Sequence, residues 1–176
     1  EHAVWVFSGT SDGNALARGR EYFRFGGIAM SPDQRLAAWS FDGNGSEFYE
    51  LKVRDVAAGS DLPDLLQNTA GGATWAADGK TFFYTLQDEN HRPLKTFRHR
   101  LGTAQDADVL VYEERDTGMF TGVGKTNSDA YIVIDVHDHD TSEIRIIDAK
   151  APEAEPRLIA PRQVGVEYDL EHWNDR

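Results

Sequence analysis

The stretch Ser31-Pro32-Asp33-Gln34-Arg35-Leu36-Ala37-Ala38-Trp39 joins a polar turn to an apolar run. The same order returns in Ala77-Asp78-Gly79-Lys80-Thr81-Phe82-Phe83-Tyr84 and in Thr126-Asn127-Ser128-Asp129-Ala130-Tyr131-Ile132-Val133. Asp33 precedes Asp78 by 45 residues, and Phe82 precedes Tyr131 by 49. Repetition at a period of roughly 40–50 residues, with four strands per repeat, is typical of β-propeller blades. The sequence therefore predicts an all-β chain of four-stranded antiparallel blades.

The expected third strand of each repeat keeps the same spacing. Apolar and charged residues alternate over residues 50–54, as in a strand with one buried face. Leu51, Phe97 and Ile144 take equivalent places and lie 46 and 47 residues apart. We therefore predict one partial β-propeller segment over residues 1–176, with about three blades at approximately 26–70, 71–117 and 118–163.

Both ends of the chain are expected to be part-blades, at residues 1–25 and 164–176. Residues 3–7 are interpreted as the last strand of a preceding blade, and residues 167–173 as the first strand of a following one. The chain is thus expected to be a segment of a larger ring. Blade faces are apolar, here with residues such as Phe41, Trp75 and Ile146. Because the outer blades of a segment lack a neighbour on one side, we expect their exposed apolar faces to cause self-association.

Composition and charge narrow the class of protein. Hydrophobic residues make up 40% of the chain, with 9 Phe, 6 Tyr and 4 Trp, which indicates an ordered domain. The 30 acidic against 18 basic residues give a net charge of −12, and this argues against nucleic acid and anionic membranes as partners. The absence of Cys excludes disulfides, thiolate nucleophiles and zinc–cysteine sites.

The same features predict the location of the protein. A chain without Cys suits a reducing compartment, so a cytoplasmic protein is expected. No apolar run of 18 residues exists, and we therefore predict no transmembrane span. The opening Glu1-His2-Ala3 has neither a basic region nor a long apolar one, so no signal peptide is expected.

Three stretches resemble catalytic or ligand-binding motifs. The G-x-S-x-G pattern at residues 9–13 would make Ser11 a nucleophile, but only eight residues precede it and no earlier loop can complete an oxyanion hole, so a turn is expected. Residues 118–126 resemble a phosphate-binding loop, yet a β-pattern follows where a helix is needed. Residues 42–47 start like a calcium loop, but Glu47 replaces the required Gly, which favours a blade hairpin.

His137-Asp138-His139-Asp140 is the one cluster with metal-ligand character, because two His at i and i+2 on a strand share a face. A solvated hairpin tip is the favoured interpretation, and adventitious metal binding by His137 and His139 is left open. Spacing gives no partner to His91, His99, Asp88-Glu89 or Glu113-Glu114, so they are expected at solvated strand ends. We predict no catalytic, cofactor-binding or metal-binding residue, and no cofactor.

The chain resembles the propeller of the prolyl oligopeptidase family, and within it oligopeptidase B (protease II). Short motifs in the family's order carry this resemblance from about Asp12 to Trp173. They are Asp12-Gly13-Asn14-Ala15-Leu16-Ala17, Tyr22-Phe23 with Gly26-Gly27, Ser31-Pro32-Asp33, Phe97-Arg98-His99, Leu101-Gly102-Thr103, Val111-Tyr112-Glu113-Glu114, Thr141-Ser142-Glu143-Ile144-Arg145 and Glu167-Tyr168.

The resemblance implies a serine peptidase in which a seven-bladed propeller covers an α/β-hydrolase domain and admits only short peptides. It implies cleavage of oligopeptides after Arg or Lys. The family's catalytic motifs match no position of this sequence, so peptide substrates are expected to bind through a separate catalytic domain, and this chain alone is expected to be inactive.

Two classes of function remain open. In the first, the chain is a propeller segment of a serine oligopeptidase that gates access to the site. In the second, it is a free-standing β-propeller-like module that binds a protein or peptide. The part-blades expected at both ends favour the first class, because a selected module should close its ring or cap its edges.

Overall fold

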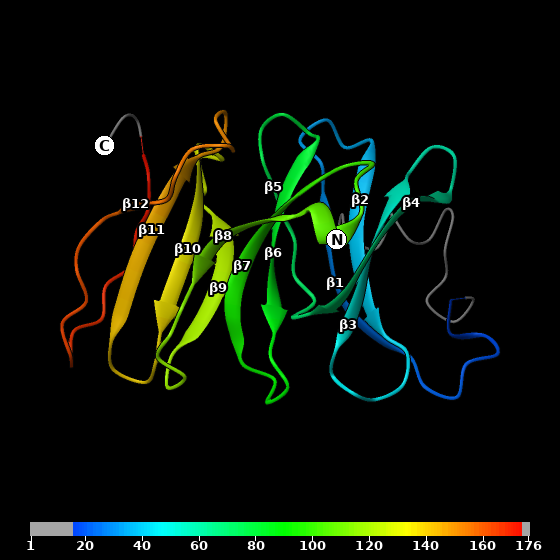
Figure 1. Ribbon diagram of the computed structural model, residues 1–176. Helices are drawn as coiled ribbons and strands as arrows, with labels where there is room; N and C mark the ends of the chain where they lie inside the picture. Colours follow the sequence, from blue (N-terminus) through cyan, green and yellow to red (C-terminus); the bar gives the residue numbers. More distant parts are fainter. Residues whose placement is uncertain (1–15, 174–176) are drawn as a thin grey trace.

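The computed structural model describes residues 16–173, which form an eight-stranded and a four-stranded antiparallel sheet. The eight-stranded sheet consists of two blades joined by the pair β4–β6, the four-stranded sheet is a third blade, and the three blades stand side by side (Figure 1). Blade 1 contains β1 (Arg24–Met30), β2 (Leu36–Asp42), β3 (Tyr49–Asp55) and β4 (Ser60–Thr69). Blade 2 contains β5 (Thr74–Trp75), β6 (Thr81–Gln87), β7 (Pro93–Arg100) and β8 (Val109–Glu113), with the 3₁₀ helix η1 (Gln105–Ala107) before β8. Blade 3 contains β9 (Phe120–Lys125), β10 (Tyr131–His137), β11 (Ser142–Asp148) and β12 (Arg157–Leu158). The predicted all-β partial propeller is confirmed.

The repeated polar turns work through local side-chain hydrogen bonds. Asp33 accepts the Ser31 hydroxyl at 2.7 Å, and Asp78 accepts the backbone N–H groups of Lys80 and Thr81, both at 2.9 Å. Although burial opposes it, these bonds hold the pKa of Asp78 below its usual range. In the third repeat a hydroxyl takes this place, since Thr126 Oγ1 accepts the N–H of Tyr131 at 3.2 Å. Each turn thus places the next strand through bonds within a few residues.

The two hydrophobic cores lie between blades, and β6 supplies both. Phe82 and Tyr84 pack towards blade 1, whereas Phe83 between them packs towards blade 3. This follows from the two-residue period of a strand, which sends successive side chains to opposite faces. Each of the three side chains is at most 1% exposed, and burying one such ring contributes about 1.5–3 kcal/mol.

The outer faces of blades 1 and 3 are covered by the chain itself, which differs from the expectation of bare faces. Phe41 is 1% exposed, because Phe23 stacks on it at 5.6 Å and the Arg20 guanidinium lies 4.6 Å from its ring. Ile146 is 5% exposed and lines a hollow of about 320 Å³ with Ile159 and other residues of the C-terminal segment. Trp75 is buried between blades 1 and 2.

The strand expected over residues 167–173 is wrong, because no strand follows β12 within residues 16–173. The segment instead crosses blade 3 and is bound largely through side chains. Tyr168 N–H donates to Ser142 Oγ at 2.7 Å, and Ile144 N–H donates to the Tyr168 hydroxyl at 2.9 Å. A strand needs a backbone ladder, and these bonds occupy the groups that would form one. The part-blade strand expected at residues 3–7 lies outside the described residues.

Candidate functional site: the polar contacts between blades

The calcium-like stretch 42–47 forms the loop between the paired strands β2 and β3, as the hairpin interpretation predicted. The Asp42 carboxylate turns inward on its own loop. It accepts the backbone N–H groups of Asn44 at 3.0 Å, Gly45 at 2.9 Å and Glu47 at 2.8 Å. Its oxygens are therefore engaged in shaping the hairpin.

The phosphate-loop-like stretch 118–126 is a strand that leads into a turn, as predicted. β9 occupies residues 120–125, and the Met119 side chain before it is buried in the core between blades 2 and 3. Such a strand presents no helix N-terminus to a phosphate. The G-x-S-x-G stretch with Ser11 lies outside the described residues.

The segment His137-Asp138-His139-Asp140 joins β10 to β11 at a hairpin tip. His137 Nδ1 lies 2.8 Å from an oxygen of Asp135, and Asp138 accepts the N–H groups of Asp140 and Thr141. Across the part of the chain that the structure describes, no three His, Asp or Glu side chains are grouped so that they could hold a metal ion. In the same residues, no helix has the length and apolarity to cross a bilayer.

The prediction of solvated strand ends is wrong for His99 and Glu114, which are both buried and bonded. The other residues covered by this prediction lie nearer the surface. Glu113 meets Lys95 at 3.3 Å with both side chains largely exposed, and the exposed His91 ring stacks on Phe48 at 4.4 Å. Asp88 binds backbone N–H groups of its own hairpin, and Glu89 beside it is exposed.

The first polar cluster joins blades 1 and 2, and we call Asp64, Tyr84, His99 and Asp108 the His99 cluster. The His99 ring is 0% exposed. Its Nδ1 lies 2.7 Å from Asp108 Oδ1, and its Nε2 lies 3.0 Å from Asp64 Oδ1. Tyr84 donates its hydroxyl proton to the other oxygen of Asp108 at 2.9 Å. Asp64 belongs to β4 of blade 1, and the other three residues belong to blade 2.

The two carboxylates favour the charged form of the histidine. Burial by itself lowers the pKa of His99, but hydrogen bonds to Asp108 and Asp64 outweigh it, and the pKa is raised. Burial, together with the charge of Asp108, raises the pKa of the Tyr84 hydroxyl. The pair His99–Asp108 has the form of a base with its orienting acid, but the second ring nitrogen of His99 lies against Asp64, where a base of this kind would face its nucleophile.

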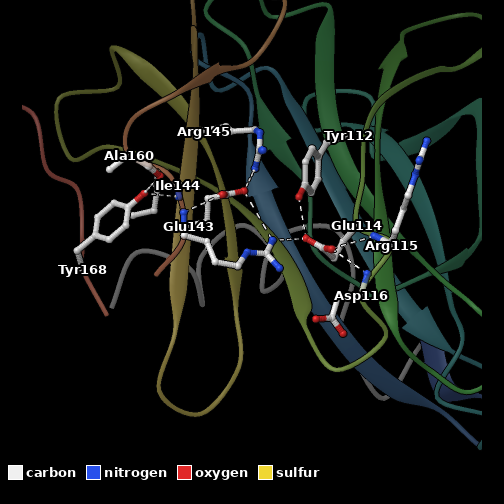
Figure 2. A network of polar contacts seen from close by, with 10 residues as sticks. Tyr112, Glu114, Arg115, Asp116, Glu143, Ile144, Arg145, Ala160 and Tyr168 are labelled. Carbon is white, nitrogen blue, oxygen red and sulfur yellow. Dashed lines mark hydrogen bonds and ion pairs between the residues drawn. The ribbon is translucent and has the colours of Figure 1, made fainter. Parts of the chain in front are cut away.

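The second polar cluster joins blades 2 and 3, and we call Tyr112, Glu114, Glu143, Arg145 and Arg162 the Arg162 cluster (Figure 2). Arg162 Nη2 lies 2.5 Å from Glu114 and 3.6 Å from Glu143, so one guanidinium bridges the end of blade 2 to β11. Tyr112 donates its hydroxyl proton to Glu114 at 2.8 Å. Arg145 pairs with Glu143 and lies 4.4 Å above the Tyr112 ring.

The charges of this second cluster also stabilise one another. Although burial raises it, the hydrogen bond from Arg162 and those from the Asp116 N–H and Tyr112 lower the pKa of Glu114. Burial raises the pKa of Tyr112 to about 12. Figure 2 also shows the Tyr168 hydroxyl bonded to Ala160 and Ile144, which fixes the segment that carries Arg162 against blade 3.

One sequence signal could have found His99. In the alternating stretch Phe97-Arg98-His99-Arg100-Leu101, His99 shares a face with Phe97 and Leu101, both of which pack against the core between blades 1 and 2. Glu114 follows β8 and gives no comparable signal, since its partner Arg162 lies 48 residues later.

Comparison with known proteins shows which family these blades belong to. The family described as "Prolyl oligopeptidase, N-terminal beta-propeller domain" matches residues 11–176. This chain belongs to the prolyl oligopeptidase family. Dipeptidyl aminopeptidase BI of Pseudoxanthomonas mexicana is 36% identical over 166 residues, covering 94% of this chain and 23% of that protein. Protease 2 of Moraxella lacunata is 32% identical, covering 93% and 24%.

Solved structures of the prolyl oligopeptidase family agree with this fold. Oligopeptidase B from Leishmania major superposes with a TM-score of 0.87 at 26% identity, and oligopeptidase B from Trypanosoma brucei with 0.83 at 30%. Each match covers 93% of this chain and 23% of the other. The resemblance to oligopeptidase B read from the sequence is confirmed, and the chain spans about a quarter of the length of the relatives it matches.

Proposed function

We propose that this chain is part of the propeller of a bacterial, cytoplasmic serine oligopeptidase that cleaves short peptides after Arg or Lys. The observation that carries the proposal is the match of residues 11–176 to the family's N-terminal propeller, together with three consecutive blades. The nucleophile, base and orienting acid would then belong to a separate catalytic domain.

The role proposed for the blades is to limit access to that catalytic domain. A wall excludes folded proteins only if its blades stay together, and both interfaces here combine an apolar core with a buried polar cluster. Rigid positioning of this kind suits a barrier that admits flexible peptides and rejects folded ones.

Preference for basic residues has two supports. Protease 2 and two oligopeptidase B structures are among the proteins that this chain is similar to. The net charge of −12 would also draw cationic peptides towards the protein. Dipeptidyl aminopeptidase BI, at 36% identity, supports a second candidate activity, the release of dipeptides from free N-termini.

Peptidase assays of the full-length gene product separate these activities. We expect hydrolysis of N-blocked Arg and Lys substrates, little hydrolysis of blocked Pro substrates, and a steep loss of rate as the peptide grows into a folded protein. Faster cleavage of dipeptidyl substrates with a free amine would favour the second activity. A full-length product without peptidase activity would instead support the free-standing binding module.

The partners proposed for this segment are peptides and its own copies, with no nucleic acid or membrane. Self-association has support in exposed apolar side chains near the C-terminus, where Val164 is 90% and Trp173 is 75% exposed. We predict that light scattering of residues 1–176 shows a mass that grows with concentration, and that Trp173→Ser reduces this growth. A monodisperse monomer at high concentration would contradict it.

A further inference from the structure

The interface between blades 1 and 2 depends on few backbone bonds. Within residues 16–173, β4 of blade 1 pairs with β6 of blade 2 through Thr69 and Leu86 alone. Farther along β4, side chains take over. Gln67 exchanges two bonds with the Gln105 amide, at 2.9 and 3.0 Å, and Asp64 reaches His99 of β7. The His99 cluster is therefore a charged contact near the middle of β4, five residues before the backbone pair at Thr69.

The geometry of this cluster favours a proton on each ring nitrogen of His99, because each nitrogen faces a carboxylate oxygen. Asp64 Oδ1 accepts the N–H of Gly102 at 2.6 Å and lies 3.0 Å from His99 Nε2, so this oxygen is placed to accept a proton on Nε2 as well. Asp108 Oδ1 likewise lies 2.7 Å from His99 Nδ1, and its other oxygen accepts the Tyr84 hydroxyl. A neutral imidazole would leave a lone pair facing a carboxylate oxygen in a site closed to water.

We propose that His99 is a protonation-dependent clamp that holds blade 1 against blade 2. With both nitrogens protonated, the ring bridges Asp64 of β4 to Asp108 of blade 2. When the proton is lost, one carboxylate loses its donor and faces a lone pair, so β4 separates from blade 2 more readily. The interface between blades 2 and 3 contains no equivalent histidine in the described residues.

The direction of the pH effect follows from the raised pKa of His99. A group whose pKa is higher in the folded state contributes its full stability below the unfolded value, which is about 6.5 for histidine. That contribution is lost as the pH rises through the folded value. The clamp is therefore closed below the unfolded value of about 6.5 and opens as the pH rises through the raised folded value of His99.

We assign the pH response to His99 after considering each group that contacts its ring. Blade 1 supplies Asp64 from β4, the connection before β8 supplies Asp108, and β6 supplies Phe82 and Tyr84. The Phe82 ring lies 4.9 Å from the imidazole and has no charge. Because the pKa of Tyr84 is raised, its hydroxyl stays protonated over the range in which His99 titrates.

The test is a titration of the His99 ring by NMR on the whole chain, with amide hydrogen exchange of β4 measured at pH 6 and pH 9. We expect the ring to titrate above free histidine, and the opening equilibrium of β4, corrected for intrinsic exchange, to rise about tenfold for each unit of that difference. Titration at or below the free value, or β4 protection that ignores pH, would overturn the proposal.

Two variants provide the controls. His99→Gln should raise the opening equilibrium of β4 at pH 6 and remove its change between pH 6 and pH 9. His91→Gln should keep that change, because the exposed His91 ring stacks on Phe48 and is not part of the His99 cluster. An unchanged pH response in His99→Gln would overturn the clamp. If His99→Gln does not fold, Asp64→Asn decides, since loss of one carboxylate must lower the titration point of His99.

Discussion

The two blade interfaces have the same architecture but differ in the cation that joins them. Between blades 1 and 2 the cation is His99, with a side chain that is 0% exposed and two carboxylates that are at most 2% exposed. Between blades 2 and 3 the cation is Arg162, with a side chain that is 24% exposed. A histidine changes its charge near neutral pH and an arginine does not. If the proposed clamp holds, the interface between blades 1 and 2 responds to pH near neutrality, whereas the interface bridged by Arg162 does not.

Neighbouring residues of a single strand serve the two interfaces. On β7, His99 turns towards blade 1, whereas Arg98 donates to Pro152 O at 2.8 Å and meets Glu153 at 2.7 Å in blade 3. Glu153 is 65% exposed, so this ion pair is screened by water and contributes little. Blade 2 is therefore bound to blade 1 through a charge cluster closed to water, and to blade 3 through charged side chains that are partly exposed.

The largest expected effect comes from the paired core residues Phe82 and Phe83. Replacing either by Ala should lower the free energy of unfolding by about 3–5 kcal/mol, because each leaves a cavity in a packed core. The two variants should differ in which strands lose protection from amide hydrogen exchange. Phe82→Ala should expose strands of blade 1, and Phe83→Ala strands of blade 3. The same blade loosening in both variants would break the distinction between the interfaces.

A smaller effect is expected at the Arg162 cluster. Arg162→Gln leaves Glu114, which is 7% exposed, without its charged donor, and should cost about 1–3 kcal/mol in urea unfolding. Arg115→Gln is the matched control. Because the Arg115 side chain is exposed, this substitution should not change the free energy of unfolding. The double variant with Glu114→Gln should lose less than the sum of the single variants.

The loss of stability in Arg162→Gln should depend on pH differently from the loss in His99→Gln. The pKa of Glu114 is lowered, so its contribution is present above the unfolded value of about 4.3 and is lost as the pH falls through the folded value. Between pH 6 and pH 9 the cost of Arg162→Gln should stay constant, while that of His99→Gln should fall. A cost of Arg162→Gln that varies over this range would remove the contrast.

The smallest effect is expected where an ion pair belongs to neither interface. Lys95 and Glu113 lie on β7 and β8 of the same blade, with side chains 46% and 40% exposed. Lys95→Gln should change the free energy of unfolding by less than about 0.5 kcal/mol, measured by urea titration beside Arg162→Gln. A loss as large as that of Arg162→Gln would show that burial at the interface is not what gives these charges their effect.

The sequence was sufficient to predict the strands and their repeat. The capping bonds of Asp33 and Asp78 join residues two or three apart, so they are visible as a turn pattern that recurs. The alternation of Phe82 and Phe83 between faces needs only the geometry of a strand. The strand expected at residues 167–173 failed because pairing requires a neighbouring backbone, which local sequence does not specify.

The packing of the blades determines which charges are buried and which partners they meet. His99 meets Asp64 across 35 residues of chain, and Arg162 meets Glu114 across 48. The blades could be predicted from local sequence, because turn bonds and two-residue alternation depend on residues close in the chain. Local sequence left the two clusters unseen, because the burial and pairing of a charge depend on which strand of the next blade faces it once the cores have packed.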